Sequence, residues 1–171
     1  MESFKNKALI WWKHVSLILE PYLGSGPLAA FFLGISSGFP FALIGATLTT
    51  RLAQDGISKS SVTAFALTFL AYNFKPLWAP IVDNTSLPFL AKYGQRRSWL
   101  WFVSLLLICA IVALGIADPS QALTMVAISA LAVGLFGATL DIIIDAYRIE
   151  LLEPNQLGVG SGMSQYGWRI G

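Results

Sequence analysis

The sequence predicts an all-α, polytopic membrane protein, because long apolar runs dominate it and charged residues are few. Hydrophobic residues make up 56% of the 171 and charged residues 12%, against about 25% charged in a typical soluble domain. One run, residues 119–140, holds 22 residues without a charge, and a helix needs about 20 to cross a bilayer. The chain is therefore expected to cross a membrane several times.

The charge-free runs divide the chain into a lead-in and a partial helical bundle. Residues 1–23 are expected to form a cytoplasmic or interfacial amphipathic helix, because Trp11, Val15 and Ile18 share one helical face. An ordinary cytoplasmic lead-in is an equal alternative. Residues 24–171 are expected to hold four spans and the start of a fifth, at about 28–50, 60–82, 98–117, 120–146 and 157–171.

Small residues and a proline shape the first span. Gly34 and Gly38 have the small-xxx-small spacing that lets two helix backbones approach closely. Pro40 has no backbone N–H, so it is expected to bend the helix near Gly38. The sequence leaves open whether these residues only pack helices together or also line a site.

The second span is polar and interrupted near its end. The residues responsible lie within eight positions of one another: Asn73, Lys75, Pro76 and Pro80. Helix-breaking residues are tolerated at membrane depth where neighbouring helices or a water-filled cavity satisfy the freed backbone groups. We therefore predict a kinked helix here.

The positions of lysine and arginine orient the spans. Seven lie on one side and two, Arg51 and Lys59, on the other, and cytoplasmic loops carry the excess of positive charge. The seven are Lys5, Lys7, Lys13, Lys92, Arg96, Arg97 and Arg148. The N-terminus and the loops at 83–97 and 147–157 are therefore predicted to face the cytoplasm.

Two aspartates and an arginine close the fourth span, where charge is costly. Helical spacing puts Asp145 one turn after Asp141, about 6 Å along the axis and on the same face, and Arg148 within reach of Asp145. Like charges this close disfavour joint ionisation, so the aspartates are expected to titrate as a coupled unit that can carry a proton. The alternative is purely structural pairing of each aspartate with a neighbour.

Lys75 and Arg169 are the other charges inside predicted spans. Lys75 lies seven or eight residues before the end of its span, at a depth similar to that of Asp141. A Lys75–Asp141 pair would neutralise both charges and provide a switchable contact or an anion-binding position. Arg169 is a second candidate for an anionic substrate group. Snorkelling to the membrane surface is the alternative for both.

The loop after the second span carries charges that could join helices. Asp83 ends one helix, and Arg96 and Arg97 precede the next. We predict that the carboxylate and the arginines form a cytoplasmic gate. The alternative is that both arginines only enforce orientation.

Other chemistries lack support in the sequence. Cys109 is the one cysteine and His14 the one histidine, so neither a disulfide within the chain nor a metal site is expected. No P-loop or dinucleotide-binding motif is present, and neither a cofactor nor a nucleic-acid partner is expected. An intramembrane aspartyl protease needs facing aspartates on separate helices, whereas Asp141 and Asp145 share one, so no enzymatic activity is expected.

Several segments taken together resemble a known family. They are Leu33-Gly-Ile-Ser-Ser-Gly-Phe-Pro40, Phe74-Lys-Pro-Leu-Trp-Ala-Pro-Ile-Val-Asp83, Gly94-Gln-Arg-Arg97, Thr139-Leu-Asp-Ile-Ile-Ile-Asp-Ala-Tyr-Arg148 and Gly167-Trp-Arg-Ile-Gly171. From about residue 28 onward the chain resembles the AmpG muropeptide permease group of the major facilitator superfamily, and more distantly the acetyl-CoA transporter branch. The segment that ends at Arg148 is the most specific part of this resemblance.

The resemblance implies the N-terminal part of a major facilitator superfamily helix bundle, in which roughly 12 to 14 spans form two halves around the substrate. It implies a proton-driven importer of anhydromuropeptides in the inner membrane, with Asp141 and Asp145 as the family's acidic pair. The residues that match its second-span and loop pattern are Lys75, Asp83, Arg96 and Arg97. The sequence departs from the superfamily's loop signature at Ala79, where that signature has glycine.

The expected partners are a small-molecule substrate, protons and membrane lipid. The chain is interpreted as a fragment that needs a missing C-terminal half or an oligomeric partner. Two alternatives remain: a transporter of another anionic solute such as acetyl-CoA, and a non-transporting membrane scaffold or truncated gene product.

Overall fold

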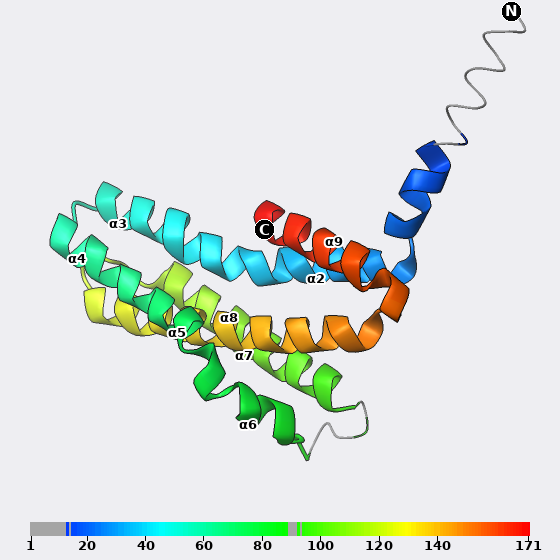
Figure 1. The fold of residues 1–171 in the computed structure, drawn as a ribbon. Coiled ribbons are helices and arrows are strands. Elements are labelled where there is room, and N and C mark those ends of the chain that lie inside the picture. Colours follow the sequence, from blue (N-terminus) through cyan, green and yellow to red (C-terminus); the bar gives the residue numbers. More distant parts are fainter. Residues whose placement is uncertain (1–12, 14, 89–91, 93) are drawn as a thin grey trace, which may run out of the picture.

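The computed structural model describes residue 13, residues 15–88, residue 92 and residues 94–171, and it builds these ranges from helices without a strand (Figure 1). Three helices in them are long and apolar enough to cross a membrane: Ser25–Gln54, Gln95–Ile116 and Leu123–Leu151. The protein is thus a helical membrane protein, as the charge-free runs predict. Trp11 and the rest of the lead-in before residue 13 lie outside the described residues.

The described part of the lead-in ends in a short turn that exposes apolar side chains. Residues 15–19 are helical, and a 3₁₀ turn, η1 (Glu20–Tyr22), connects them to the first long helix. Ile18 and Leu23 are both more than half exposed. The placement of this segment on a membrane surface stays a prediction.

The first long helix is continuous but changes its geometry partway. α2 (Ser25–Ala42) passes into π-helical turns, η2 (Leu43–Leu48), and then into α3 (Thr49–Gln54). Pro40 lies inside α2 and has no N–H to donate. The structure therefore has π-helical turns shortly after Pro40, and the bend near Gly38 stays a prediction.

The second predicted span is not one continuous helix. It is divided into α4 (Lys59–Ala64), η3 (Phe65–Phe69), α5 (Leu70–Asn73), η4 (Lys75–Leu77) and α6 (Ala79–Asn84). Pro76 and Pro80 each stand in the first turn of a new helical segment, where a missing N–H costs nothing. The kink that the prolines predict is present, and the chain turns away after α5 (Figure 1).

The fourth predicted span forms the centre of the bundle. It is α8 (Leu123–Leu151), which packs against α7 (Gln95–Ile116), α2 and the broken α4–α6 segment. Its fully buried side chains anchor the core: Val126, Ala130, Val133 and Ile143. A turn at Pro154–Gln156 (η6) then leads to α9 (Leu157–Ile170). Residues in the middle of α8 are therefore surrounded by other helices.

Glycines allow α2 and α9 to lie in direct backbone contact (Figure 1). A Cβ on Gly34 would meet the Ser164 carbonyl oxygen at 2.2 Å, and one on Gly38 would meet that of Trp168 at 2.1 Å. The relation is reciprocal, because a Cβ on Gly167 would meet the Phe31 carbonyl oxygen at 2.1 Å. No side chain larger than hydrogen fits at these positions, so the glycines fix the distance between the two helices.

Candidate functional site

A partly buried ion pair joins the broken segment to the central helix. The Lys75 ammonium contacts Oδ2 of Asp141, and the Ser37 hydroxyl donates to Oδ1 of the same carboxylate. Side chains of Lys75 and Asp141 are 23% and 17% exposed, and Ser37 is almost completely buried. Both oxygens of Asp141 are thus held by donors from two other elements, one charged and one neutral.

The ion pair faces a cavity of about 270 Å³ that five elements of the fold line. The wall combines ionisable, hydroxyl, amide and aromatic side chains. Its residues are Gly34, Ser37 and Phe41 of α2, Tyr72 of α5, Lys75 of η4, Asp141, Ile144 and Asp145 of α8, and Ser164, Gln165 and Trp168 of α9. The cavity therefore offers both charge and hydrogen-bonding groups inside an otherwise apolar bundle.

The break in the second segment positions Lys75. α5 ends at Asn73, and η4 begins at Lys75 with Pro76 in its first turn. This change of direction brings the Lys75 ammonium 5.3 Å from the centre of the Tyr72 ring, within the range of a cation–π contact. The Trp78 indole donates to the Thr139 hydroxyl at 3.2 Å and so ties the next turn to α8.

Aromatic rings form one side of the cavity. The Phe41 ring lies 5.4 Å from that of Tyr72 and 5.5 Å from that of Trp168, and it also packs on Phe69 at 4.6 Å. The Tyr72 hydroxyl is buried without a hydrogen-bond partner among the described residues. Such a group is costly unless a water or a ligand reaches it, so this wall is suited to contact a bound molecule.

Asp145 and Arg148 form a second, more exposed ion pair. The distance from Nη2 of Arg148 to Oδ1 of Asp145 is 3.3 Å, and the Asp145 side chain is 57% exposed. Asp145 also lines the cavity, whereas Arg148 does not. Asp141 and Asp145 therefore share one face of α8, and each has a cation of its own. Their coupled titration stays a prediction.

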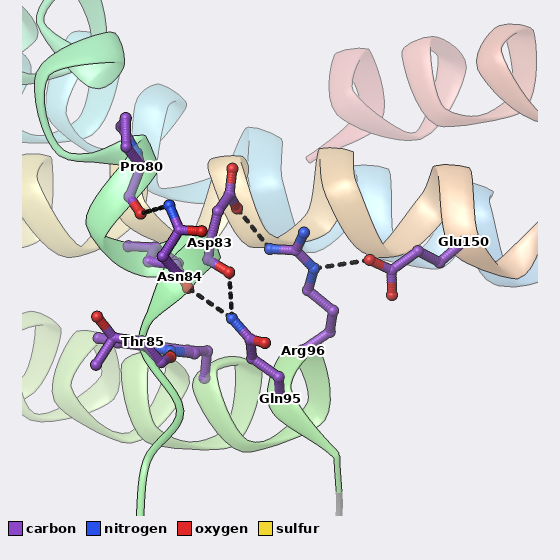
Figure 2. Close-up of polar contacts among 9 residues, drawn as sticks. Pro80, Asp83, Asn84, Thr85, Gln95, Arg96 and Glu150 are labelled. Atoms are coloured by element: carbon purple, nitrogen blue, oxygen red, sulfur yellow. Dashed lines mark hydrogen bonds and ion pairs between the residues drawn. The ribbon is translucent and has the colours of Figure 1, made fainter.

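A third charged cluster lies at the end of α7 near residue 95, and Figure 2 shows its members. Arg96 donates to the Asp83 carboxylate at 2.5 Å and to the Glu150 carboxylate at 2.9 Å. Gln95 donates to the carbonyl oxygens of Val82 and Asp83. Arg96 thus connects α6, α7 and α8.

Arg97 does not join Asp83 as the sequence predicted. Its Nε lies 3.4 Å from the Tyr147 hydroxyl oxygen instead. Successive helical residues point about 100° apart, so the two adjacent arginines start from α7 in different directions, and Arg96 reaches Asp83 while Arg97 reaches Tyr147. The predicted cluster of one carboxylate and two arginines is instead one arginine, Arg96, between two carboxylates, Asp83 and Glu150.

Arg169 lies away from the cavity. Its side chain is exposed, and the cavity is lined by Gln165 and Trp168 of the same helix. The structure therefore does not bring this predicted site residue together with Lys75 and Asp141.

Several cavity residues were missed by reasoning from sequence. Ser37, Tyr72, Gln165 and Trp168 carry no charge, and such residues occur throughout membrane helices. The signal that could have found Ser37 is its position between Gly34 and Gly38, on a helix expected to pack closely. Among the described residues, no group of three or more His, Cys, Asp or Glu is placed to hold a metal ion.

Comparison with known proteins bears on the same segments. Residues 28–171 match the family described as acetyl-coenzyme A transporter 1. The chain is 37% identical to the putative transporter AmpG 4 of Rickettsia felis over 141 residues, which cover 82% of this chain and 34% of that protein. It is 35% identical to the anhydromuropeptide permease of Escherichia coli K12 over 139 residues, 81% of this chain and 28% of that permease.

The matched region contains every residue of the cavity and of the charged clusters described above. The chain spans about a third of the length of the curated relatives that it matches. Because the match covers most of the chain and its relatives are named as transporters and permeases, this chain belongs to the acetyl-coenzyme A transporter 1 family and resembles the AmpG transporters.

Proposed function

We propose that this chain is part of a proton-coupled transporter that imports anhydromuropeptides across the inner membrane for cell-wall recycling. The Lys75–Asp141 ion pair beside the central cavity carries the proposal. Ionisable groups inside membrane helices are costly, and they mark substrate pathways and proton relays. The name of the E. coli relative supports the substrate assignment.

Asp141 is the proposed proton site. Its carboxylate is held between Ser37 and Lys75 and faces the cavity, so protonation would release Lys75 and change the charge that a substrate meets. Asp145 and Arg148 form a neighbouring pair at the mouth of the same site. No chemical step is assigned to these groups, and we propose a permease without enzymatic activity.

The cluster around Arg96 is the proposed cytoplasmic gate. The excess of lysine and arginine on this side supports an orientation with the N-terminus and residues 83–97 in the cytoplasm. Arg96 joins three elements through partly exposed ion pairs, which are weak enough to break and reform. Opening this end of the bundle would then require Arg96 to leave Asp83 or Glu150.

The experiment that tests this proposal is an uptake assay on a chimera, in which residues 28–171 replace the matching segment of the E. coli permease. In E. coli cells without their own permease, we expect the chimera to restore uptake of labelled anhydromuropeptide and a protonophore to abolish that uptake. Asp141→Asn should remove the uptake while the amount of protein in the membrane is unchanged. A chimera present in the membrane at normal level without uptake would contradict the substrate, and uptake indifferent to the protonophore would contradict the coupling.

Acetyl-CoA is the second candidate substrate, because the matched family carries that description. Membrane vesicles from the same cells distinguish the two candidates. Uptake of labelled anhydromuropeptide is measured with unlabelled acetyl-CoA as competitor, and uptake of labelled acetyl-CoA with unlabelled anhydromuropeptide; the true substrate is the one that is taken up. The alternative of a membrane scaffold that transports nothing makes a different prediction. The 171-residue chain would then have a single defined oligomeric mass in detergent, and the chimera would not transport.

A further inference from the structure

The Asp141 carboxylate is bound as a ligand carboxylate would be bound. One oxygen accepts from the Ser37 hydroxyl on α2, and the other contacts the Lys75 ammonium on η4. Two donors from separate elements therefore meet both oxygens of one carboxylate, which is an anion-binding arrangement built around a side chain. The buried Tyr72 hydroxyl, which has no hydrogen-bond partner in the described part of the chain, lies on the same cavity wall.

We propose that Lys75 and Ser37 form the binding site for a carboxylate group of the substrate, and that Asp141 occupies this site in its absence. The inference rests on the proposed transport function and specifies how its site recognises the substrate. When Asp141 takes up a proton, it ceases to compete for the Lys75 ammonium. A substrate carboxylate then pairs with Lys75 and accepts from Ser37, and the Tyr72 hydroxyl can donate to it.

Charge balance makes this exchange favourable in a membrane interior. With Asp141 ionised, Lys75 and Asp141 sum to zero. With Asp141 protonated and one carboxylate bound, the sum is zero again, so one proton enters with each carboxylate. Either half of the exchange alone would leave an uncompensated charge at membrane depth, which is costly.

Few other charges face this site. On α8 itself, Asp145 lines the cavity but is paired with Arg148. The cavity walls from α2 and α9 contribute serine, glutamine, glycine and aromatic side chains, and α5 contributes Tyr72. The arginines of α7 lie at Glu150 and Tyr147, near the far end of α8. Among these groups only Asp141 contacts the Lys75 ammonium, and Asp145 is near enough to act on it electrostatically.

The test measures how fast Lys75 reacts, in the full 171-residue chain reconstituted in lipid nanodiscs. Reductive methylation with formaldehyde and cyanoborohydride, the hydride donor, is followed by mass spectrometry at Lys75 and, as internal reference, at exposed Lys59. Acetate is the probe and neutral acetamide its control. In Asp141→Asn, acetate at ten times its Kd should slow methylation of Lys75 about tenfold, because protection scales as one plus the ratio of ligand to Kd.

In the wild type at pH 8, the same acetate concentration should slow Lys75 methylation several-fold less than in Asp141→Asn, since the tethered Asp141 competes for Lys75 at a high effective concentration. Two adjacent serines provide the matched controls. Adding Ser37→Ala to Asp141→Asn should reduce the protection several-fold. Adding Ser36→Ala should leave it unchanged, because the Ser36 hydroxyl donates to the Phe32 carbonyl of its own helix at 3.2 Å.

Equal slowing by acetate and acetamide in Asp141→Asn would overturn the inference, as would equal acetate protection in the variant and the wild type. Protection by inorganic phosphate without protection by acetate would overturn the carboxylate assignment. Should Asp141→Asn fail to insert, Asp141→Ser replaces it. Because methylation needs no transport, proton-driven uptake by the chimera combined with a failed protection test would reject this inference and leave the proposed function standing.

Discussion

Gly34 of α2 lies against the backbone of Ser164 of α9, 130 positions away in the sequence, so closely that a Cβ on the glycine would meet the Ser164 carbonyl oxygen at 2.2 Å. Both residues line the cavity that contains the Lys75–Asp141 pair. The closest contact between two helices therefore forms part of the wall of the candidate site. A change in the packing there is expected to alter both stability and binding.

Replacing Gly34 with alanine should destabilise the protein, because the backbone of α9 must move to accept the methyl group. Overpacking of this kind costs about 1–3 kcal/mol. Gly162→Ala on α9 is the matched control, since a Cβ there meets nothing within 4 Å and should gain up to about 1 kcal/mol of helix propensity. Thermal unfolding in one detergent compares the two; equal stability of both variants would contradict the packing argument.

Arg51 should contribute to stability by capping the end of α7. Its guanidinium donates to the carbonyl oxygens of Leu114 at 3.0 Å and Ala117 at 2.7 Å. Hydrogen bonds that involve a charged group contribute about 1.5–3 kcal/mol, and the partial exposure of Arg51 places the expected loss for Arg51→Ala at the lower end. Arg51→Lys keeps the charge but replaces the two separate nitrogens that reach these carbonyls with a single ammonium, so the free energy of unfolding should fall between those of the wild type and Arg51→Ala. Lys59→Ala, as the control, should change little.

Arg96→Gln should weaken the contact between α6, α7 and α8 more than Arg97→Gln does. Arg96 makes two ion pairs, whereas Arg97 donates to one neutral hydroxyl. Partly exposed ion pairs contribute about 0.2–1 kcal/mol each, so the expected difference between the variants is about 1 kcal/mol. The comparison is made by denaturant unfolding at low salt and repeated at about 1 M salt, where screening should reduce it. A difference insensitive to salt would refute an electrostatic origin.

Asp118, between α7 and α8, should make stability depend on pH. The Ser120 hydroxyl donates to its carboxylate at 2.7 Å and, with the Ser120 N–H, holds the pKa of Asp118 below its ordinary value of 3.8. Because the pKa is lower in the folded state, ionised Asp118 stabilises the protein above pH 3.8. This contribution is lost as the pH falls through the folded value.

Ser120→Ala should therefore reduce stability near pH 6 and leave it nearly unchanged at the acid end of the titration. Thermal unfolding across this pH range measures the effect, and Ser60→Ala, at an exposed serine in the first turn of α4, is the control. A loss for Ser120→Ala that is equal at every pH would show that the hydroxyl acts by packing and not on the charge of Asp118.

The sequence offered the Lys75–Asp141 contact as one of two alternatives, the other being snorkelling of Lys75, and the structure shows the contact. Both charges are isolated in apolar segments at similar depths from the same end, and an unpaired charge there is costly. It also predicted the kink, because Pro76 and Pro80 cannot continue a helix. An unpaired charge in an apolar segment and a proline inside a helix both cost much free energy, and few arrangements of the chain avoid these costs.

Other features depended on rotation about a helix axis, which a single sequence does not determine for a helix with no polar face. Arg169 follows Trp168 by one residue and so points about 100° away from the cavity. Arg97 misses Asp83 for the same reason, and Glu150 reaches Arg96 because α8 continues past the core. The position of Ser37 between Gly34 and Gly38 indicates a closely packed helix face, but the sequence does not show that its hydroxyl meets Asp141.

The close contact between α2 and α9 also has a consequence for biosynthesis. At roughly 5–20 residues per second, translation of the 130 residues from Gly34 to Ser164 takes on the order of 10 s. During that interval the face of α2 that carries Gly34 and Gly38 is in the membrane without α9 against it. Lipid tails or the insertion machinery must cover this face until then. The order in which helices enter the bilayer thus differs from the order in which they find their final neighbours, and the cavity wall can close only when α9 arrives.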